Sequence, residues 1–393
     1  MNLLTLAYFK YANFGIQNFN ALLVTLGAVP IGWTPILLPI GLSFYIFHAI
    51  SYLVDIYRRE APPAERLLDF AAFVALFPHL IAGPVLRYKL LAQQFESRQH
   101  SLEQFGAGAQ RFMVGFVKKV MVADTLAPLV QATFALPAPS ASDAWLGALT
   151  FAMQLYFDFS GYTDMAIGLA AMMGFKFPEN FDHPFISTSA SEFFRRWHMS
   201  LSSWFRDYVF FPLERLARKG RRSNRNVTAL NLLIMMVLVG FWHGANWTFL
   251  LWGLTLGLLL ATELGLRRKR WWKPLPPLLK LPVSFGASLL LFVLFAAPTV
   301  QDAWRMYQGM FGHFGFRLTD NLAWQITRLE LFTLAVAVAL VFLGPLWERA
   351  QTITSPRWSV ALWGVSLLTV PLFVLSVAKL LSQGDTPFLY FQF

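Results

Sequence analysis

The sequence predicts an all-α protein, a polytopic bundle of transmembrane helices. Of its 393 residues, 56% are hydrophobic and only 13% are charged, whereas a soluble domain carries about 25% charged residues. The mean hydropathy is +0.50, and the 39 Phe and 14 Trp residues suit packed helices and aromatic belts. Because the core of one soluble domain would not need so many apolar residues, we expect a multi-pass membrane protein.

Charge and cysteine content exclude several classes of function. We interpret the net charge of +11 as basic cytoplasmic loops rather than as a surface for nucleic acid. The chain has no cysteine, which excludes disulfides and thiol nucleophiles. We expect no metal site and no cleavable signal peptide. Walker A, G-x-G-x-x-G, G-x-S-x-G and H-E-x-x-H motifs are absent, so nucleotide hydrolysis, dehydrogenase, hydrolase-fold and zinc protease functions have no support.

Nine stretches are candidate spans, because a bilayer-crossing helix needs about 20 mostly apolar residues. The stretch 144–174 is too long for one span and contains Asp158 and Asp164, so we expect two spans or a broken helix there. The stretch 15–32 is a weaker candidate. The nine are 34–54, 67–86, 109–135 (which contains Lys118 and Lys119), 144–174, 227–245, 247–264, 281–299, 329–347 and 358–380.

Two strongly basic stretches set the expected topology. We place "ERLARKGRRSNR" (214–225) and "RRKRWWK" (267–273) on the cytoplasmic side. The residues between them suffice for a two-helix hairpin whose turn, "HGAN" at 243–246, lies on the far side. Continuing the alternation, 300–328 faces outward, 348–357 faces inward and the C-terminus faces outward.

The stretch 189–213 predicts one amphipathic helix on the cytoplasmic side, lying in the interface or walling a cavity. Ser189 and Glu192 have the spacing of a capping box. The apolar residues at helical spacing are Phe194, Trp197, Leu201, Trp204 and Tyr208. The residues on the opposite face are Arg195, Ser202 and Arg206.

The stretch "VGFWHGANWTFLLWG" (239–253) places His243 and Asn246 among apolar residues. Polar groups are costly in hydrocarbon unless something there needs them. A neutral imidazole can accept a proton from a hydroxyl, and Asn246 or a tryptophan N–H such as that of Trp242 can orient the reacting groups. The alternative is a histidine that only packs helices; we favour the catalytic interpretation.

His198 and the arginines around it form a second candidate site. His198 is either an interfacial residue beside Trp197 or a functional group. Arg195, Arg196 and Arg206 either hold a phosphate-bearing donor or anchor the helix to anionic lipid.

The intramembrane acids and the "FPHLIAGPVLRY" stretch (77–88) leave more than one interpretation open. Asp158 and Asp164 indicate acid/base chemistry, cation coupling or pairing within the bundle. Arg87 follows the Gly83–Pro84 break, and we consider Asp158 or Asp164 as its partner. We interpret His79 as packed and leave His48 open; no role is assigned to three further residues, His100, His183 and His313.

Seven stretches, in this order, resemble the membrane-bound O-acyltransferase superfamily, especially its alginate O-acetylase branch. They span nearly the whole chain. They are "YFKYANF" (8–14), "LLPIGLSFYIFHAISYLVDIYR" (37–58), "FPHLIAGPVLR" (77–87), "YFDFSGYTDMAIG" (156–168), "FFRRWHMSLSSWFRDYVF" (193–210), "GFWHGANWTFLLWG" (240–253) and "PFLYFQF" (387–393).

The resemblance implies a single domain over 1–393, built around a central tunnel and lacking N-terminal helices of the family. It implies a multi-pass protein of the bacterial inner membrane. His243 matches the catalytic histidine and His198 the second motif histidine, while Arg87 and Asp158 or Asp164 match functionally important motifs. The implied donor is a cytoplasmic thioester, acetyl-CoA or an acyl carrier protein, with no bound cofactor.

The implied acceptor is a hydroxyl of an alginate-like exopolysaccharide or of a periplasmic carrier protein. The implied partners are membrane lipids, a cytoplasmic acyl carrier and periplasmic acetyltransferase or polysaccharide-modifying proteins. The "FFPLERLARKGRR" stretch departs from the family pattern, which keeps D-alanyl or other acyl transfer to teichoic acid, cellulose or peptidoglycan open. The alternatives of another class are a proton-coupled transporter or flippase, although no repeated halves are visible, and a scaffold of an export complex.

Overall fold

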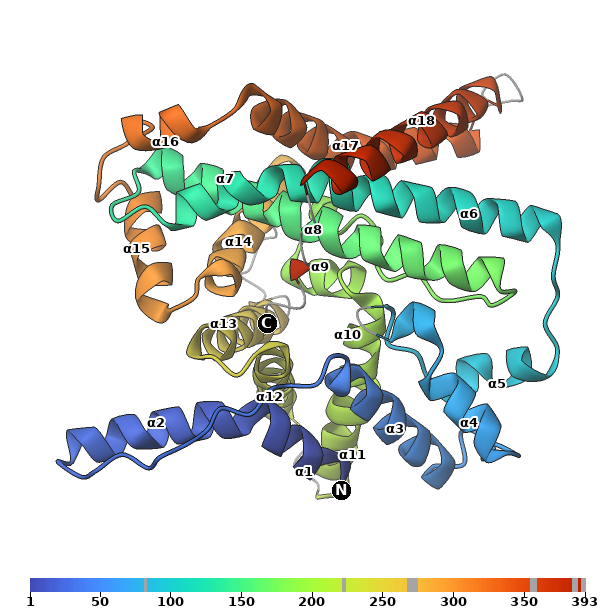
Figure 1. The fold of residues 1–393 in the computed structure, drawn as a ribbon. Helices are drawn as coiled ribbons and strands as arrows, with labels where there is room; N and C mark the ends of the chain where they lie inside the picture. The colour runs from blue at the N-terminus through green and yellow to red at the C-terminus, as the bar shows by residue number, and fades with distance from the viewer. Residues whose placement is uncertain (81–82, 221–223, 267–274, 354–358, 384–387, 390–393) are drawn as a thin grey trace.

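The computed structural model describes residues 1–80, 83–220, 224–266, 275–353, 359–383 and 388–389, which are helical and contain no β-strand (Figure 1). The first half comprises α1 (Asn2–Leu6), η1 (Ala7–Tyr11), α2 (Ala12–Thr25), α3 (Leu42–Tyr57), α4 (Leu67–Val74), η2 (Phe77–His79), α5 (Tyr88–Glu96), α6 (Leu102–Val117), η3 (Lys118–Ala123), α7 (Asp124–Phe134) and α8 (Ala141–Met172). The second half comprises η4 (Pro184–Ile186), α9 (Ala190–Arg196), α10 (Met199–Phe205), η5 (Arg206–Phe210), α11 (Phe211–Lys219), α12 (Arg225–His243), α13 (Trp247–Leu266), α14 (Pro277–Ala296), α15 (Val300–Met310), α16 (Asp320–Gln325), α17 (Arg328–Ile353) and α18 (Ser359–Gln383).

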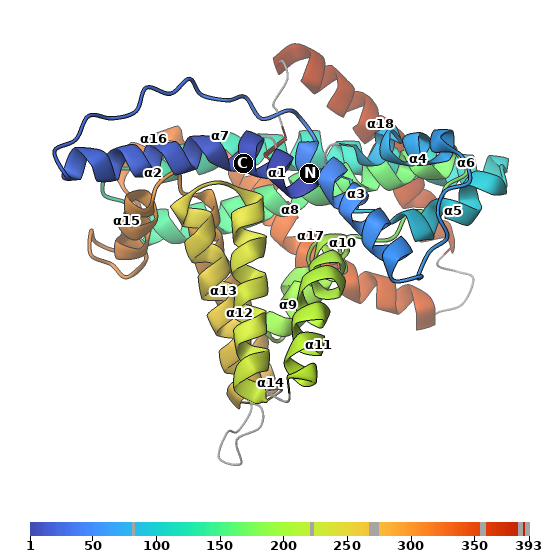
Figure 2. The ribbon, with the colours of Figure 1, turned by 90° about the horizontal axis from the view of Figure 1, so that it is seen from below.

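Four helices among the described residues are long and apolar enough to cross a membrane: α12, α13, most of α14 and the first part of α17. They confirm the spans predicted at 227–245, 247–264, 281–299 and 329–347. The helices α12, α13 and α14 pack in sequence, and α12 and α13 project from one side of the band of helices that contains α2, α7 and α8 (Figure 2). The apolar helix at 34–54 is shorter than predicted, since α3 begins only at Leu42. The helix α18 (Ser359–Gln383) agrees with the predicted stretch 358–380, whose first residue lies outside the described residues.

The hairpin of α12 and α13 forms because glycines let the two helices touch. A Cβ on Gly240 would collide with the carbonyl oxygen of Phe249, and a Cβ on Gly253 would collide with that of Met236. The turn between the helices covers 244–246. Arg225 starts one helix and Leu266 ends the other, next to the basic stretches; 267–273 and 221–223 lie outside the described residues. Following the orientation expected from the basic stretches, we use the names cytoplasmic end for that end and outer end for the turn.

The helix α8 corrects one prediction: 144–174 is neither broken nor two spans. Its residues up to Met172 lie within one continuous helix of 32 residues. Ser140 and Asp143 form a capping box at its start. The acidic residues do not interrupt it, because cations of the neighbouring run α6–η3–α7 neutralise them: Lys119 contacts Asp158 at 2.7 Å and Lys118 contacts Asp164 at 2.6 Å. That continuous run contains the predicted stretch 109–135 as far as Phe134.

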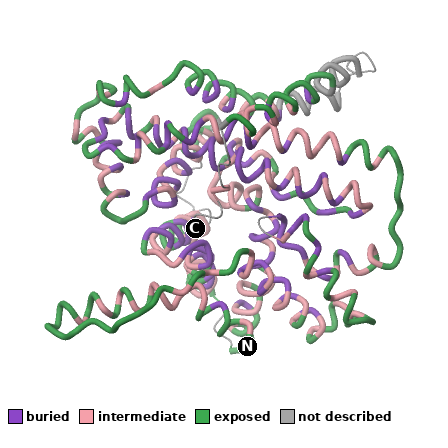
Figure 3. The backbone as a smooth tube through the Cα atoms, in the orientation of Figure 1, coloured by how far each residue is buried: buried purple, intermediate pink, exposed green. Residues whose placement is uncertain are grey.

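Two further predicted helices are also wrong in their extent. The stretch 67–86 does not form a span: α4 ends at Val74, and the short η2 begins at Phe77 with Pro78 in its first turn. Proline cannot continue a helix without losing a backbone hydrogen bond, which accounts for the break. The weaker candidate 15–32 is helical only as far as Thr25, the last residue of α2. The helix α2 extends away from the rest of the protein as an exposed arm (Figure 3).

The amphipathic stretch 189–213 is several helices instead of one. The helix α9 ends at Arg196, and His198 has a positive φ of 44° before α10 begins. A left-handed residue cannot continue a right-handed α-helix, so the chain turns at this histidine. The helical-face prediction therefore fails for Ser202, which is buried and donates its hydroxyl to the carbonyl oxygen of Phe194 at 3.1 Å. Ser189 does cap α9, by accepting from the backbone N–H of Glu192.

Candidate active site

His243 is the last residue of α12 and lies among aromatic rings. Its side chain is only 9% exposed. The centroid of its ring lies 5.1 Å from Trp242, 5.3 Å from Trp252 and 5.1 Å from Phe295. Residues of α12, α13 and α14 thus surround the imidazole. The predicted apolar surroundings of this histidine are confirmed.

The N-terminal segment stabilises the end of α12, because the last carbonyl groups of a helix have no partners within it. Lys10 donates to the carbonyl oxygens of Trp242 and His243, and Tyr11 donates to that of Phe241 at 3.1 Å. A cation at a helix C-terminus also interacts favourably with the helix dipole. Sequence reasoning assigned no role to Lys10, although a lysine in the apolar stretch "YFKYANF" was a visible signal.

Asn246 and Trp242 hold the outer end of this hairpin. The amide nitrogen of Asn246 donates to the carbonyl oxygen of Pro298 at 2.9 Å, and its oxygen accepts from the backbone N–H of Thr248 at 3.2 Å. The ring of Trp242 is buried and stacks on Phe47 at 5.1 Å. Asn246 therefore ties α13 to the segment after α14, and Trp242 ties α12 to α3.

His198 is buried at the turn between α9 and α10. Its Nδ1 lies 3.1 Å from the side-chain oxygen of Asn180, which also accepts from the hydroxyl of Ser200 at 2.8 Å. The backbone N–H of Met199 donates to the backbone carbonyl oxygen of Asn180. Asn180 thus fixes both the imidazole and the left-handed turn that carries it. Sequence reasoning missed Asn180, because nothing in the sequence relates it to a residue 18 positions later.

Both histidines line one enclosed hollow, here named the histidine chamber, of about 20 Å³. Next to it a larger cleft of about 470 Å³ lies between α9, α13 and α14, here named the α13–α14 cleft. Ser288, Leu256, Phe193 and Leu291 line both. The cleft extends along the side chains of Glu263, Leu266 and Lys280, toward the cytoplasmic ends of α13 and α14.

The three arginines predicted to bind a donor do not gather at the histidine chamber. Arg195 is exposed on α9. Arg196 contacts Glu192 at 3.0 Å, and Arg206 contacts Asp207 at 3.3 Å. None of the three lines the chamber or the α13–α14 cleft.

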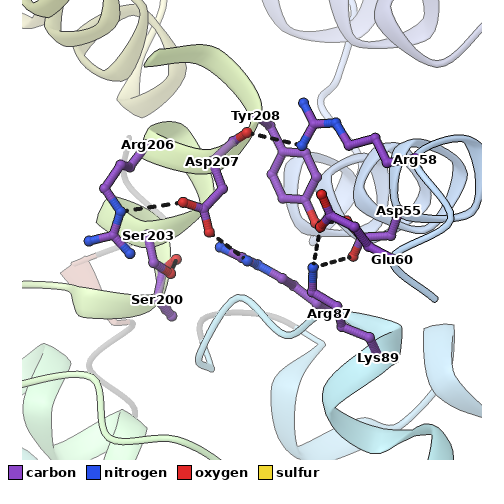
Figure 4. A network of polar contacts seen from close by, with 10 residues as sticks. All are labelled: Asp55, Arg58, Glu60, Arg87, Lys89, Ser200, Ser203, Arg206, Asp207 and Tyr208. Carbon is purple, nitrogen blue, oxygen red and sulfur yellow. Dashed lines mark hydrogen bonds and ion pairs between the residues drawn. The ribbon is translucent and has the colours of Figure 1, made fainter. Parts of the chain in front are cut away.

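Arg87 corrects another prediction, because its partner is neither Asp158 nor Asp164. Its guanidinium contacts Asp207 at 2.7 Å and lies over the ring of Tyr208 (Figure 4). The reason is the fold: Arg87 immediately precedes α5, which packs on α3, whereas α8 brings its two acids to η3 and α6.

The same network continues through Tyr208 to α3. The hydroxyl of Tyr208 donates to the buried carboxylate of Asp55 at 2.7 Å (Figure 4). Lys89 contacts Asp55 at 3.3 Å and Glu60 at 2.9 Å. The hydrogen bond from Lys89 holds the pKa of the Glu60 carboxyl below its ordinary value. Charges from α3, α5 and η5 are thus tied together on one side of the bundle.

The two acids of α8 take part in separate ion clusters. Asp158 is buried, contacts Lys119 and accepts from the backbone N–H of Leu389 at 3.0 Å. Asp164 accepts from Arg111 at 2.9 Å and from Lys118 at 2.6 Å. Neither lines the histidine chamber. Among the described residues, no three acidic or histidine side chains are grouped so that they could hold a metal ion.

Comparison with known proteins gives a consistent family. The profile of the membrane-bound O-acyltransferase family matches residues 64–294. The chain is 46% identical over 421 residues to the probable alginate O-acetylase AlgI of Azotobacter vinelandii, covering 100% of this chain and 83% of the relative. It is 43% identical over 442 residues to that of Pseudomonas aeruginosa, covering 100% and 84%.

A more distant relative is named for a different acceptor, peptidoglycan. The peptidoglycan O-acetyltransferase of Helicobacter pylori is 31% identical over 353 residues, covering 81% of this chain and 64% of the relative. The family profile covers more than half of the chain, and the helical structure has several helices that can span a membrane. This multi-pass membrane protein therefore belongs to the membrane-bound O-acyltransferase family and is an O-acyltransferase.

Proposed function

We propose that this enzyme transfers an acetyl group from a cytoplasmic thioester, across the bacterial inner membrane, to a hydroxyl on the outer side. The acceptor is an alginate-like exopolysaccharide or a periplasmic carrier protein that passes the group on to one. The observation that carries the proposal is the position of His243: it ends α12 at the turn of the hairpin and lines a chamber that adjoins a cleft running toward the opposite ends of α13 and α14. The similarity to two probable alginate O-acetylases supports an acetyl group as the transferred group and alginate as the acceptor.

In the proposed reaction His243 is the general base. The acceptor oxygen attacks the thioester carbonyl carbon while the imidazole takes the hydroxyl proton. The carbon–sulfur bond then breaks, and the leaving thiolate takes the proton from the imidazolium, so that an ester and a free thiol remain. His198 faces the same chamber. The side-chain oxygen of Asn180 accepts from its Nδ1–H, which leaves Nε2 of the neutral ring without a proton, and we assign His198 the orientation of the attacking hydroxyl through that nitrogen.

The thioester enters as a substrate, acetyl-CoA or an acetylated carrier protein. The α13–α14 cleft suits the arm of such a donor, because its walls are mostly apolar and Lys280 and Glu263 lie at its cytoplasmic part. Arg195 is exposed on α9, one of the helices beside the cleft, and Arg206 is exposed on η5. We keep both as contacts for donor phosphates outside the cleft, with lipid headgroups as their alternative ligands. Arg196 is engaged with Glu192 and is a weaker candidate.

The competing functions receive less support. A proton-coupled transporter needs carboxylates that can exchange cations, and Asp158 and Asp164 are each held by a lysine. Acetyl transfer to peptidoglycan stays an alternative, because the family also includes a relative named for peptidoglycan acetylation. The choice of acceptors in the following test decides it.

The test is acetyl transfer by the purified full chain in lipid nanodiscs. The protein is incubated with radiolabelled acetyl-CoA and, separately, deacetylated alginate, peptidoglycan fragments or a periplasmic acetyl-carrier protein. We expect label on alginate or on the carrier, and none with His243→Ala. The matched control is His313→Ala, which changes an exposed histidine after α15. Transfer by a folded His243→Ala variant at the normal rate would contradict the proposal.

A further inference from the structure

A second cavity, of about 490 Å³, lies among η3, α7, α8 and α15, and is here named the α7–α15 cavity. Its size falls within the range of about 300–1,000 Å³ typical of small-molecule sites. It shares no lining residue with the histidine chamber or the α13–α14 cleft. One of its walls is Pro298, the residue whose carbonyl accepts from Asn246. The cavity therefore lies at the outer end of the bundle, beside the turn that carries His243.

A thin aromatic wall separates this cavity from the histidines. Phe151 lines the α7–α15 cavity and Phe292 lines the histidine chamber, and their ring centroids are 6.3 Å apart. Phe134, also in the cavity, lies 6.1 Å from Phe151. The cavity thus offers two neighbouring aromatic faces against which an apolar ring surface can pack.

Two residues that line the cavity each carry a buried polar atom with no hydrogen-bond partner within the described part of the chain. One is the acceptor oxygen Oε1 of Gln154, whose side chain is only 6% exposed. The other is the donor Nε of Arg305. Leaving such groups unpaired is unfavourable by about 1–3 kcal/mol each. One unmatched acceptor and one unmatched donor in a single cavity indicate a ligand group that both donates and accepts.

The charged groups of the cavity are already matched by one another. Lys119 contacts Asp124 at 2.7 Å, and Arg305 contacts Asp302 at 2.8 Å. An anionic ligand would have to displace one of these carboxylates. The cavity is therefore arranged for hydroxyl groups, which donate and accept at once, more than for a carboxylate.

We propose that the α7–α15 cavity binds a sugar residue through its hydroxyl edge. One hydroxyl donates to Oε1 of Gln154 and accepts from Nε of Arg305, while the C–H face of the ring packs against Phe134 and Phe151. The inference rests on the proposed function, because the sugar is a residue of the acceptor polymer. It adds that the enzyme recognises this sugar residue by its hydroxyl groups. The sugar would be separated from the histidine chamber by the aromatic rings of Phe151 and Phe292.

The test measures sugar binding by titration calorimetry, with the full chain in nanodiscs and without any acyl donor. The His243→Ala background prevents transfer. The probes are a deacetylated mannuronate oligosaccharide and a neutral mannose oligosaccharide. We expect both oligosaccharides to bind with similar affinity, because the cavity binds the sugar through its hydroxyl groups and not through a carboxylate.

Two variants on different helices remove the two unmatched atoms. Gln154→Met keeps the volume and loses the acceptor; Arg305→Lys keeps the charge beside Asp302 and loses Nε. Each should weaken binding about tenfold, as expected for one buried hydrogen bond. The matched control Gln308→Met, on α15 but outside the cavity lining, should bind normally. A variant that fails to fold, judged by its thermal melting, is replaced by the other.

Several outcomes would overturn the inference. Folded protein that binds neither sugar means that the cavity holds only water. Binding of the mannuronate alone means that a carboxylate is read, and binding that ignores both variants places the sugar elsewhere. These results can be told apart from those of the transfer assay. If the sugar binds and binding needs Gln154, this inference stands even when no acetyl transfer is detected. If acetyl groups are transferred to a carrier protein but no sugar binds, this inference is wrong and the proposed function stands.

Discussion

Two pairs of buried histidines occupy different surroundings in this bundle. His198 and His243 line the histidine chamber, which adjoins the α13–α14 cleft. His48 and His79 pack edge to face with ring centroids 4.6 Å apart, both 0% exposed. Neither of them lines the chamber, that cleft or the α7–α15 cavity. Phe73 contacts both rings of this second pair.

The difference lies in access to ligands and not in residue type or burial. An imidazole can act as a base only where a substrate hydroxyl can approach within hydrogen-bond distance. The His48–His79 pair is surrounded by aromatic packing between α3 and η2. The comparison therefore predicts that chemistry depends on the first pair and that the second pair contributes packing.

The largest expected effect comes from removing the base. His243→Ala should lower the rate of acetyl transfer by about 100- to 10,000-fold, the usual contribution of a general base. His79→Phe, which fills its site with an apolar ring, should transfer at close to the normal rate. Rates are measured with labelled acetyl-CoA at equal amounts of folded protein. Equal losses in the two variants would erase the distinction between the pairs.

The second test closes the access route without touching a histidine. Ser288 is buried and lines both the chamber and the α13–α14 cleft. Ser288→Phe should reduce the rate of acetyl transfer by more than about tenfold. A bulky ring at this point would block the path along which the thioester of the donor reaches His243. Ser288→Ala removes only the hydroxyl and should behave normally. Normal transfer by a folded Ser288→Phe protein would mean that the donor arrives by another path.

Hydrophobic periodicity predicted the long spans and the hairpin at His243, because α12 and α13 are apolar and their turn is marked by Gly244 and Asn246. It failed where tertiary contacts decide. The continuity of α8 depends on lysines from another helix, and the break at His198 depends on Asn180. Neither partnership has a local sequence signal. The same holds for the ion pair of Arg87 with Asp207, which could not be predicted from the sequence.

A smaller effect should follow from loosening His198. Asn180→Leu removes the oxygen that both Nδ1 of His198 and the hydroxyl of Ser200 contact. We expect a fall in kcat of about 10- to 100-fold, because small displacements of a reacting group are costly, while the KM for the acceptor stays near its normal value. Asn180→Asp, which retains the oxygen, should recover part of the rate. A change confined to thermal stability would leave Asn180 with a structural role only.

The smallest effect on transfer is expected for the sealed pair. Both ring nitrogens of His48 are buried without a hydrogen-bond partner among the described residues, and unpaired buried polar atoms weaken a fold. The double variant His48→Phe/His79→Leu should therefore transfer acetyl groups within about twofold of the normal rate and melt at the same or a higher temperature. The measurement pairs the transfer assay with thermal unfolding in nanodiscs. A folded double variant without activity would show that this pair also serves the reaction, and access to a cavity would then no longer separate catalytic from packed histidines.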